Sequence, residues 1–383
     1  MVVATSLSSS SLLAGTTLSS PSRCAMTSPL EHRHAAKLLA PLARWFDLHK
    51  RQLPWRATNL HIRHHNPYAV LVSEFMLQQT QVNTVIPYFK RWMRRFPNVN
   101  KLAGASPDIV MKHWEGLGYY RRCRNLQISS QWIKKNGWPK DRSEMESLPG
   151  IGPYTSAAIG SIAFQWPTPA LDGNVIRFLS RFHAINLTRR HQVSFMETWL
   201  QPALQVLGPS RLTQGLMEFG SLVCKKYEPA CLSCPIKRDC QAYQSDRVDL
   251  FPKPKKRIKP QIKHRAVLII TRKDRILIQN PQSDGLLGNL YCFPTFNLAP
   301  RERATIPYIH RYSHIIEYIY PSRIQVDNIE INSGYRWVTL NQLSRLPLGK
   351  RDLALLGQMH KLKDPKNLSI KIISRACKNI FKK

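Results

Sequence analysis

Residues Leu148 to Arg177 read LPGIGPYTSAAIGSIAFQWPTPALDGNVIR, and this stretch decides the fold. Gly150 and Gly152 flank a single apolar residue, so the backbone can turn tightly there and expose its N–H groups. Pro153 suits the first position of a helix, and a helix is predicted over 154–164. A helix N-terminus behind a glycine turn binds phosphate well. The stretch alone also fits a helical hairpin followed by an ordinary polar turn.

The composition indicates a folded and strongly basic chain. Its 383 residues suggest two or three domains, and 57 Lys plus Arg against 23 Asp plus Glu give a net charge of +34. Such an excess favours a polyanionic partner, with nucleic acid preferred to a membrane surface. The alternative is a proteome whose proteins are basic in general. No apolar run reaches the roughly 18 residues that a membrane span requires, so no membrane partner is expected.

Hydrophobic periodicity divides the chain into a helical part and a part of short strands. The expected segments are a disordered Ser/Thr-rich N-terminus (1–30), an all-α domain (31–246), a stiff basic Pro/Lys linker (247–264), a domain of strands with a closing helix (265–363) and a loosely held basic tail (364–383). Helices are expected at 38–48, 67–79, 82–95, 107–114, 120–134, 143–147, 154–164, 175–183, 195–206 and 211–223. Strands are expected at 266–271, 276–280, 290–296, 313–320 and 334–340, and a helix at 353–362.

Four of the eight cysteines lie close together in the pattern Cys224-x6-Cys231-x2-Cys234-x5-Cys240. A packed quartet in a large helical chain favours a metal site in a reducing compartment over disulfides. Four thiolates on so short a loop can enclose an iron–sulfur cube, with tetrahedral zinc as the alternative. Zinc sites usually show two C-x-x-C pairs and this loop has one, which favours the cluster.

Glu74 lies inside the apolar helical stretch VSEFMLQQTQV, from Val72 to Val82. A buried carboxylate without a cation partner tends to keep its proton, because desolvation disfavours the charged form. A protonated Glu near neutral pH is what a general acid for a leaving purine base requires. The alternative is a helix glutamate that is partly exposed.

Six motifs occur together in this chain: LPWR, SEFMLQQTQV, GLGYYRR, LPGIGPYT, LDGNVIR and the cysteine loop. In order and spacing they resemble those of adenine DNA glycosylases, the MutY family, over about residues 38–246, and the resemblance continues into the C-terminal domain. It implies a multidomain α plus α+β protein. Its all-α helix-hairpin-helix glycosylase domain would carry a 4Fe-4S cluster loop at 224–240, and a Nudix-like α/β domain would follow.

The resemblance also implies roles for individual residues. Glu74 matches the general acid that protonates adenine at N7, and Asp172 matches the residue that stabilises the positive sugar once the N-glycosidic bond breaks. Tyr154 and Asn174 match neighbours that position the sugar and Asp172. The other implied sites are a base-stack wedge (Gln79, Thr80, Tyr119), an adenine pocket (Arg51, Leu53, Trp55, Gln214, Met217), DNA-backbone contacts (Gly150, Gly152) and the cluster ligands (Cys224, Cys231, Cys234, Cys240).

Tyr154 also bears on the type of reaction. Relatives that resemble endonuclease III carry a lysine at this point, which forms a Schiff base. This chain has no lysine between Lys140 and Lys225. We therefore expect base removal without efficient strand cleavage. A smaller departure from the family is Ile176, where many relatives have a basic residue.

The stretch GLLGNLYCFPTF, from Gly285 to Phe296, resembles the signature of the family's Nudix-like domain. The acidic helix with which a Nudix pyrophosphatase holds metal is missing, so recognition is expected rather than nucleotide hydrolysis. In the family an aromatic–Ser–His loop reads 8-oxoguanine. Here Tyr312, Ser313 and His314 match it, and the added tyrosine hydroxyl must find water or a partner. A short 297–308 connection is a second departure, and an ordinary strand edge is the alternative.

Taken together, these features predict a monofunctional adenine DNA N-glycosylase of base excision repair, which flips adenine out of duplex DNA opposite 8-oxoguanine or guanine. We expect one 4Fe-4S cluster, double-stranded DNA as partner, and a monomer in the cytoplasm, at the nucleoid if the chain is bacterial. Residues 1–25 leave organelle targeting open, since they are rich in Ser and Thr but hold one basic side chain. A bifunctional pyrimidine-lesion glycosylase is disfavoured by Tyr154 and the C-terminal domain. A non-catalytic DNA-binding scaffold is disfavoured by the paired carboxylates Glu74 and Asp172.

Overall fold

The structure is a computed structural model of the chain. It describes residues 29–56, 65–186, 190–253, 259–282, 290–299, 302, 307–312, 314–327, 329–359 and 370–381. Four of the features discussed above lie outside the described residues: the N-terminal segment 1–25, the start of the GLLGNLYCFPTF stretch at 285–289, the centre of the linker at 254–258, and Ser313. Within the described residues, no helix combines the length and the hydrophobicity needed to cross a membrane.

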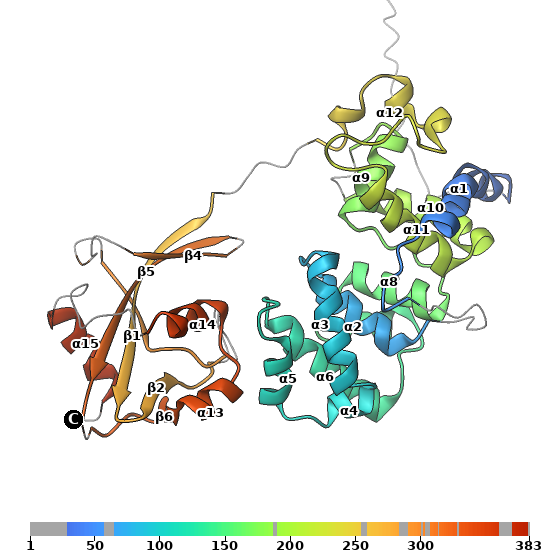
Figure 1. Cartoon of the computed structure of the whole chain (residues 1–383). Coiled ribbons are helices and arrows are strands. Elements are labelled where there is room, and N and C mark those ends of the chain that lie inside the picture. Colours follow the sequence, from blue (N-terminus) through green and yellow to red (C-terminus); the bar gives the residue numbers. More distant parts are fainter. Residues whose placement is uncertain are drawn as a thin grey trace, which may run out of the picture.

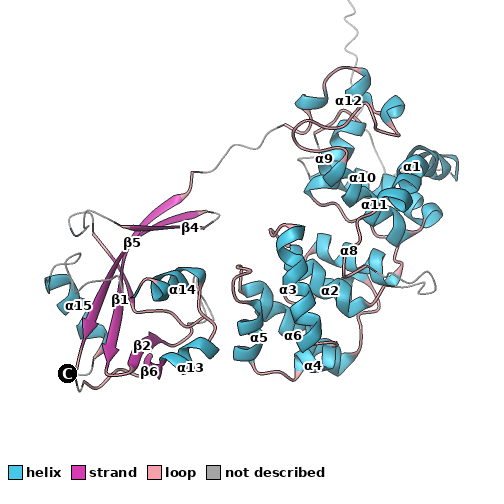
Figure 2. Ribbon diagram, viewed as in Figure 1, coloured by secondary structure: helices cyan, strands magenta, loops and turns pink. Residues whose placement is uncertain are grey.

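The first part of the chain is helical (Figures 1 and 2). Its helices are α1 (Pro29–His49), α2 (Pro67–Leu77), α3 (Val82–Arg95), α4 (Val99–Ala103), α5 (Pro107–Trp114), α6 (Arg121–Asn136), α7 (Arg142–Glu146), α8 (Pro153–Phe164), α9 (Gly173–Phe182), α10 (Arg190–Leu207), α11 (Pro209–Leu222) and α12 (Gln241–Gln244). Every helix expected from periodicity is present, although α1 and α10 begin several residues earlier than expected. The sequence did not predict α4 and α12, whose five and four residues give only a weak periodic signal.

Two hydrophobic cores divide the helical part into two lobes. The first lobe contains α2 to α8 around buried side chains such as Phe75, Trp92 and Trp114. The second joins α1 to α9, α10 and α11 around Leu39 and Phe219. Helix α1 therefore packs on helices that come more than a hundred residues later. The chain passes between the lobes after α1 and again after α8, which brings distant segments to their junction (Figure 1).

The C-terminal part is built on one mixed sheet with helices on both faces (Figures 1 and 2). Its elements are β1 (Gln261–Arg272), β2 (Arg275–Gln279), β3 (Thr295–Asn297), β4 (Tyr308–Arg311), β5 (Ile315–Gln325), β6 (Tyr335–Thr339), α13 (Leu340–Arg345), α14 (Lys350–Gly357) and α15 (Ile370–Ile380). The strand order is β4-β5-β1-β2-β6, and β3 also pairs with β1. Strands β1 and β5 are parallel, and the other pairs are antiparallel. The hairpin predicted around RKDR is present, with Arg272 opposite Arg275.

Several features of this domain differ from expectation, and β4 and α13 were not predicted at all. Strand β1 begins inside the expected linker, because Gln261 already pairs with Ile315 of β5. Of the strand expected at 290–296, only the last residues join β3. The C-terminal tail is not loosely held throughout, since α15 buries Ile380 in the core on one face of the sheet. The amphipathic spacing of α15 provides the apolar stripe that this packing needs.

The sheet domain contacts the first helical lobe at α5. The backbone N–H of Leu348 donates to Glu115 Oε1 at 2.8 Å, and Lys112 Nζ donates to the carbonyl of Leu346 at 3.1 Å. Leu290 is buried in the core of the first lobe. The two domains are therefore in direct contact as well as being connected through the linker.

Candidate active site

A cavity of about 490 Å³ lies at the junction of the two helical lobes. Its walls come from the segment after α1 and from α2, α8, α9 and α11. The predicted residues that line it are Arg51, Leu53, Trp55, Glu74, Thr80, Tyr154, Asp172, Asn174, Gln214 and Met217. Other predicted residues do not line this cavity: Gln79, Tyr119, Gly150, Gly152, the four clustered cysteines, Tyr312 and His314.

Glu74 supplies a buried acid to this cavity. Helix α2 begins behind Asn66, whose side chain accepts hydrogen bonds from the N–H groups of Tyr68 and Ala69, and its last two turns bury Glu74 to 7% exposure. Burial is the main cause that raises the pKa of Glu74 to about 7. Tyr154 OH donates to Glu74 Oε2 at 3.2 Å and partly opposes this rise, while the charge of Asp172 adds to it.

Asp172 occupies the N-cap position of α9. Its Oδ1 accepts the backbone N–H groups of Asn174 and Val175 at 2.8 and 2.7 Å, and its Oδ2 accepts Asn174 Nδ2 at 2.9 Å. Burial raises the pKa of Asp172, while these hydrogen bonds and the nearby Arg177 counteract the rise. Donors at a helix N-terminus favour the ionised carboxylate.

The two carboxyl groups therefore differ in their surroundings. Glu74 accepts the hydroxyl of Tyr154 and forms no ion pair within the described part of the chain, whereas Asp172 accepts three donors. Burial favours a proton on Glu74, whose pKa is raised to about 7, while the three donors around Asp172 favour its charged form, which is the pairing that acid-assisted cleavage at a sugar carbon requires. Burial and the two carboxyl groups raise the pKa of Tyr154 well above its usual value, so its phenol stays a neutral donor.

Asn174 holds Asp172 in position, and Arg177 in turn holds Asn174. Arg177 Nη2 donates to Asn174 Oδ1 at 3.0 Å, and Arg177 Nε donates to the carbonyl of Cys224 at 2.9 Å. Helices α9 and α11 approach closely here, because a Cβ on Gly220 would lie 2.7 Å from the carbonyl oxygen of Asn174. Gly220 is thus required for the position of Asp172.

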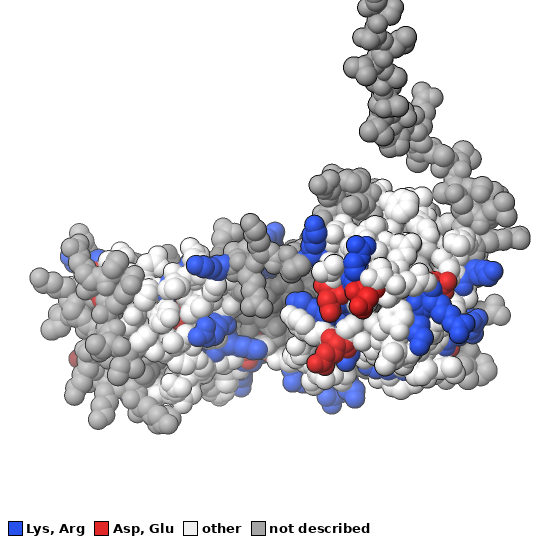
Figure 3. All heavy atoms as spheres, turned by 90° about the horizontal axis from the view of Figure 1, so that it is seen from above, with Lys and Arg blue, Asp and Glu red and all other residues white. Residues whose placement is uncertain are grey.

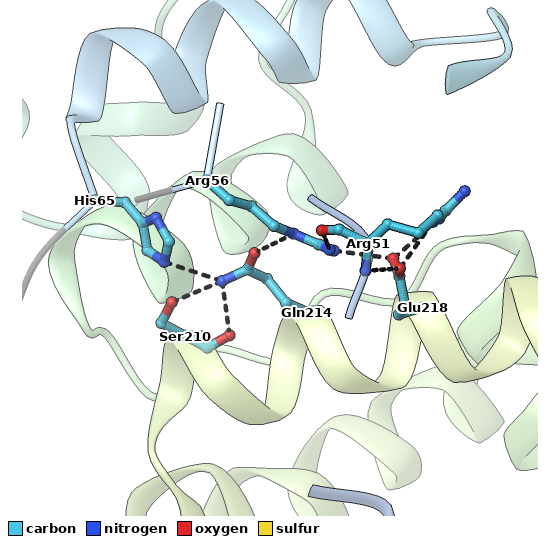
Figure 4. Close-up of polar contacts among 6 residues, drawn as sticks. All are labelled: Arg51, Arg56, His65, Ser210, Gln214 and Glu218. Carbon is cyan, nitrogen blue, oxygen red and sulfur yellow. Dashed lines mark hydrogen bonds and ion pairs between the residues drawn. The ribbon is translucent and has the colours of Figure 1, made fainter. Parts of the chain in front are cut away.

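Glu218 and Arg56 line the cavity and were not predicted (Figure 4). Arg51 Nε and Arg56 Nη2 donate to the two oxygens of Glu218 at 2.7 and 2.9 Å. These partners lower the pKa of Glu218 to about 2 despite its burial. Sequence signals existed for both residues, since Arg56 ends the LPWR motif and Glu218 is an isolated carboxylate in an apolar helix, as Glu74 is.

Gln79 and Tyr119 lie on two neighbouring loops that Arg122 joins. Both have positive φ, 57° and 51°, and the ring of Tyr119 is 41% exposed. Arg122, which is 8% exposed, donates to the carbonyls of Phe75 (3.0 Å) and Gly118 (3.1 Å), to the carbonyl of Gln78, and to Thr80 Oγ1 (3.1 Å). One guanidinium thereby fixes both loops and presents Tyr119 to solvent.

Arg122→Lys is expected to separate these two loops. A lysine keeps the charge but cannot supply the forked set of donors, so several buried carbonyls lose their partners. We expect duplex affinity to fall by about tenfold or more and stability by on the order of 1–3 kcal/mol. Binding titrations and thermal unfolding measure the two effects. Arg124→Lys, two residues on along α6, is the matched control, and equal behaviour of the two variants would contradict this role.

Gly150 makes the turn before α8. Its φ is 81°, and a Cβ there would lie 2.6 Å from the side chain of Asn125 and 3.0 Å from Phe75, so no other residue fits without rearrangement. Gly152 is the N-cap of α8, and Pro153 is its first residue, as predicted. Both glycines are exposed, which leaves the N-terminus of α8 accessible to an anion.

The four clustered cysteines line one small cavity of about 30 Å³ together with Arg181. Arg181 Nη1 donates to Cys224 Sγ at 3.4 Å and to the carbonyl of Lys225 at 2.6 Å. Their thiols form no disulfide, and among the described residues no group of three or more ligand side chains is arranged to hold a single metal ion. Four convergent thiols with an N–H···S donor fit an iron–sulfur cluster.

The turn between β4 and β5 carries Tyr312 and His314. Tyr312 OH donates to the buried Glu317 Oε2 at 3.2 Å, which provides the partner that the hydroxyl requires. The ring lies edge-on to His310, at 4.6 Å between centroids, and His314 is exposed. The expected strand 313–320 begins at Ile315, so these residues are at the tip of a hairpin.

Comparison with known proteins identifies the family of this chain. Residues 72–201 match the HhH-GPD superfamily of base excision DNA repair proteins. The chain is 33% identical over 314 residues to the adenine DNA glycosylase of Buchnera aphidicola subsp. Baizongia pistaciae, and the match covers 76% of this chain and 88% of that protein. The chain therefore belongs to the adenine DNA glycosylase family, the MutY family that its motifs resemble, and is an enzyme of the DNA N-glycosylase class.

Eukaryotic relatives are longer than this chain. The adenine DNA glycosylases of Arabidopsis thaliana and Mus musculus are 34% and 35% identical to it, and each match covers 68% of this chain. The matches cover 47% and 61% of those proteins. Solved structures that match include a thermostable thymine-DNA glycosylase, at 20% identity, 56% of this chain, 98% of that chain and a TM-score of 0.49. A non-covalent endonuclease III–DNA complex matches at 23% identity, 58% of this chain, 99% of that chain and a TM-score of 0.47.

Proposed function

We propose that the chain hydrolyses the N-glycosidic bond of adenine that lies opposite 8-oxoguanine or guanine in duplex DNA. The observation that carries the proposal is the cavity between the lobes, where Glu74 with a pKa raised to about 7 meets the capped carboxylate Asp172. Membership in a family whose curated members are named adenine DNA glycosylases supports adenine as the base.

The reaction follows from the placement of these groups. A base inside a duplex is inaccessible, so the nucleotide must rotate out of the stack into the cavity. Glu74 gives its proton to the adenine ring and makes it a better leaving group, while Asp172 stabilises the positive charge that develops on the sugar. The N-glycosidic bond breaks as adenine leaves with that proton. Water then attacks the sugar carbon and gives its surplus proton to the Glu74 carboxylate, which restores the acid. Tyr154 donates a hydrogen bond to Glu74 and lies within range of the charge of Asp172. It therefore holds the carboxyl group of Glu74 in position.

Base removal without strand cleavage is expected from the side chains in the cavity. Among the described lining residues the basic groups are Arg51 and Arg56, both held by Glu218, and no lysine amine is available to form a Schiff base. The test is a single-turnover assay on an adenine:8-oxoguanine duplex. Strand breaks should appear only after alkali treatment, and borohydride should trap no covalent complex. Efficient trapping would instead support the bifunctional alternative.

We propose that two exposed loops and the N-terminus of α8, all beside the cavity, contact duplex DNA. Tyr119 and Gln79 would fill the space that the flipped nucleotide leaves, and the N-terminus of α8 would bind a backbone phosphate. Lysine and arginine side chains are spread in several groups along the face shown in Figure 3. The net charge of +34 should make binding strongly dependent on salt.

The sheet domain is proposed to be a Nudix-like reader of 8-oxoguanine. The support is the hairpin tip with Tyr312 and His314, which matches the family's aromatic–Ser–His loop. The hydrogen bond from Tyr312 to Glu317 holds this ring against the domain. The tyrosine ring would therefore insert less deeply into the DNA base stack than a phenylalanine ring at the same position.

The cysteine cavity is proposed to hold a 4Fe-4S cluster on Cys224, Cys231, Cys234 and Cys240. Such a cluster would hold the loop in shape and present its lysines to DNA phosphates. We expect brown protein with about four iron atoms per chain, and Cys231→Ser should lose both iron and duplex affinity. Metal analysis with visible spectroscopy measures this, with Cys292→Ser in the sheet domain as the control. Colourless protein with one zinc per chain would contradict it.

A further inference from the structure

Helix α11 carries a row of polar side chains that points toward Arg51, Arg56 and His65 (Figure 4). Ser210, Gln214 and Glu218 are spaced four residues apart and so lie on one side of the helix. Opposite them are Arg51 and Arg56, and, beyond the cavity wall, His65. Glu218 is held by the two arginines, and His65 contacts Gln214, the middle member of the row.

The directions of the hydrogen bonds that Gln214 makes follow from chemistry. Arg56 Nε donates to Gln214 Oε1 at 2.9 Å, and arginine can only donate, so the oxygen of the Gln214 amide must face Arg56. The amide nitrogen of Gln214 then faces Ser210 Oγ at 3.0 Å, the carbonyl of Ser210 at 3.3 Å and His65 Nε2 at 3.1 Å, so one of its two protons is shared between the two Ser210 oxygens and the other points at His65. This nitrogen is a donor, and therefore His65 Nε2 must accept, with the ring proton on Nδ1.

The charges around His65 favour this neutral acceptor. The ring is partly buried, the positive charges of Arg56 and Lys50 act on it, and α11 presents the uncharged Gln214 to it. Burial and the two cations lower the pKa of His65 below its usual value. A donor in place of the ring nitrogen would repel the Gln214 amide. The amide would then turn, and its NH₂ group would meet the guanidinium of Arg56.

We infer that His65 is a positioning residue for base recognition: by accepting a hydrogen bond from Gln214 it fixes the amide that aligns Arg56 on Glu218 in the cavity wall. The inference rests on the proposed function, because the cavity is taken as the adenine site. His65 does not itself contact the base. It acts through Gln214, which lines the cavity, on two further lining residues, Arg56 and Glu218.

The test compares two substitutions of His65. Glutamine can place an acceptor oxygen near the position of Nε2, whereas leucine fills similar space without an acceptor. Under single-turnover conditions on an adenine:8-oxoguanine duplex, His65→Leu is expected to slow excision by roughly tenfold with duplex affinity and melting temperature little changed. His65→Gln should recover most of the rate, and His113→Leu on α5 should leave it unchanged. Equal losses in the leucine and glutamine variants, or no loss in the leucine variant, would overturn the inference.

A second measurement is independent of activity. Long-range ¹H–¹⁵N spectra of histidine-labelled protein report which ring nitrogen is protonated, and the signals missing from His65→Gln identify His65. The inference requires the neutral ring with its proton on Nδ1 at pH 7. A proton on Nε2, or a charged ring, would overturn it. If the wild-type chain excises no adenine, the proposed function fails, and the tautomer still decides the role of His65 in the row.

Discussion

Replacing Glu74 with glutamine is expected to slow adenine excision by roughly 10³-fold, because general acid catalysis by a positioned carboxyl group contributes on the order of 10²–10⁴ to the rate. Glutamine fills the same space and can still accept the hydroxyl of Tyr154 that bonds Glu74. Duplex affinity should therefore stay within about threefold of the wild type. Single-turnover excision and a binding titration on the same duplex separate the two effects. Normal excision by the variant would contradict the role of Glu74.

The rate of excision by the wild type should depend on pH through the protonation of Glu74. The folded-state pKa of Glu74 is raised to about 7, so the protonated acid is lost as the pH rises through that value. Excision by the wild type should accordingly fall above about pH 7. A carboxyl group whose pKa is raised by folding stabilises the fold at low pH and loses that contribution as the pH rises through the folded value. At pH 8 the glutamine variant should therefore be more stable than the wild type, by on the order of 1–3 kcal/mol, and its inactivity could not be attributed to unfolding.

Asp172→Asn is expected to reduce excision by roughly 10²–10³-fold without unfolding α9. Asparagine caps helices about as well as aspartate, so its side-chain oxygen can still accept the N–H groups of Asn174 and Val175. The substitution removes the negative charge beside the developing sugar cation, and it also places an NH₂ group against Asn174 Nδ2, which donates to Asp172 Oδ2 in the wild type. Because that one donor loses its acceptor, the free energy of unfolding should fall by about 1–3 kcal/mol. Ser106→Asn, at the N-cap of α5, is the control for a cap change away from the cavity.

A variant that keeps full activity would show that the charge of Asp172 is not used. The comparison with Glu74→Gln is also informative. Because the two carboxyl groups act on opposite sides of one bond, the double variant should lose less than the product of the two separate effects. Strict multiplication of the losses would mean that the two groups act independently.

The helical framework was accessible from the sequence because its signals are local. Pro153 and Pro107 mark helix starts, and each is the first residue of α8 or α5 in the structure. An acidic residue in an apolar stretch likewise indicated the burial of Glu74. These predictions depended on spacing and capping, which the chain expresses within a few residues.

The remaining parts depended on contacts between distant segments. In the sequence Arg122 lies next to exposed basic residues and looks like one of them. It is buried because two loops meet around it and accept its hydrogen bonds. The pairing of α1 with α11, and of Arg56 with Glu218, joins residues more than 150 positions apart. The start of strand β1 and the helix α15 were not predicted. Each is ordered by a distant partner, β5 for the strand and the sheet core for the helix, and the local sequence does not indicate that partner.

The most direct test of the proposed adenine glycosylase activity is single-turnover excision of adenine from three duplexes that differ only in the base opposite it: 8-oxoguanine, guanine and cytosine. We expect excision opposite 8-oxoguanine and, more slowly, opposite guanine, with little opposite cytosine. We also expect that Glu74→Gln abolishes excision in all three duplexes. Release of a pyrimidine instead of adenine, or equal rates for the three duplexes, would contradict it.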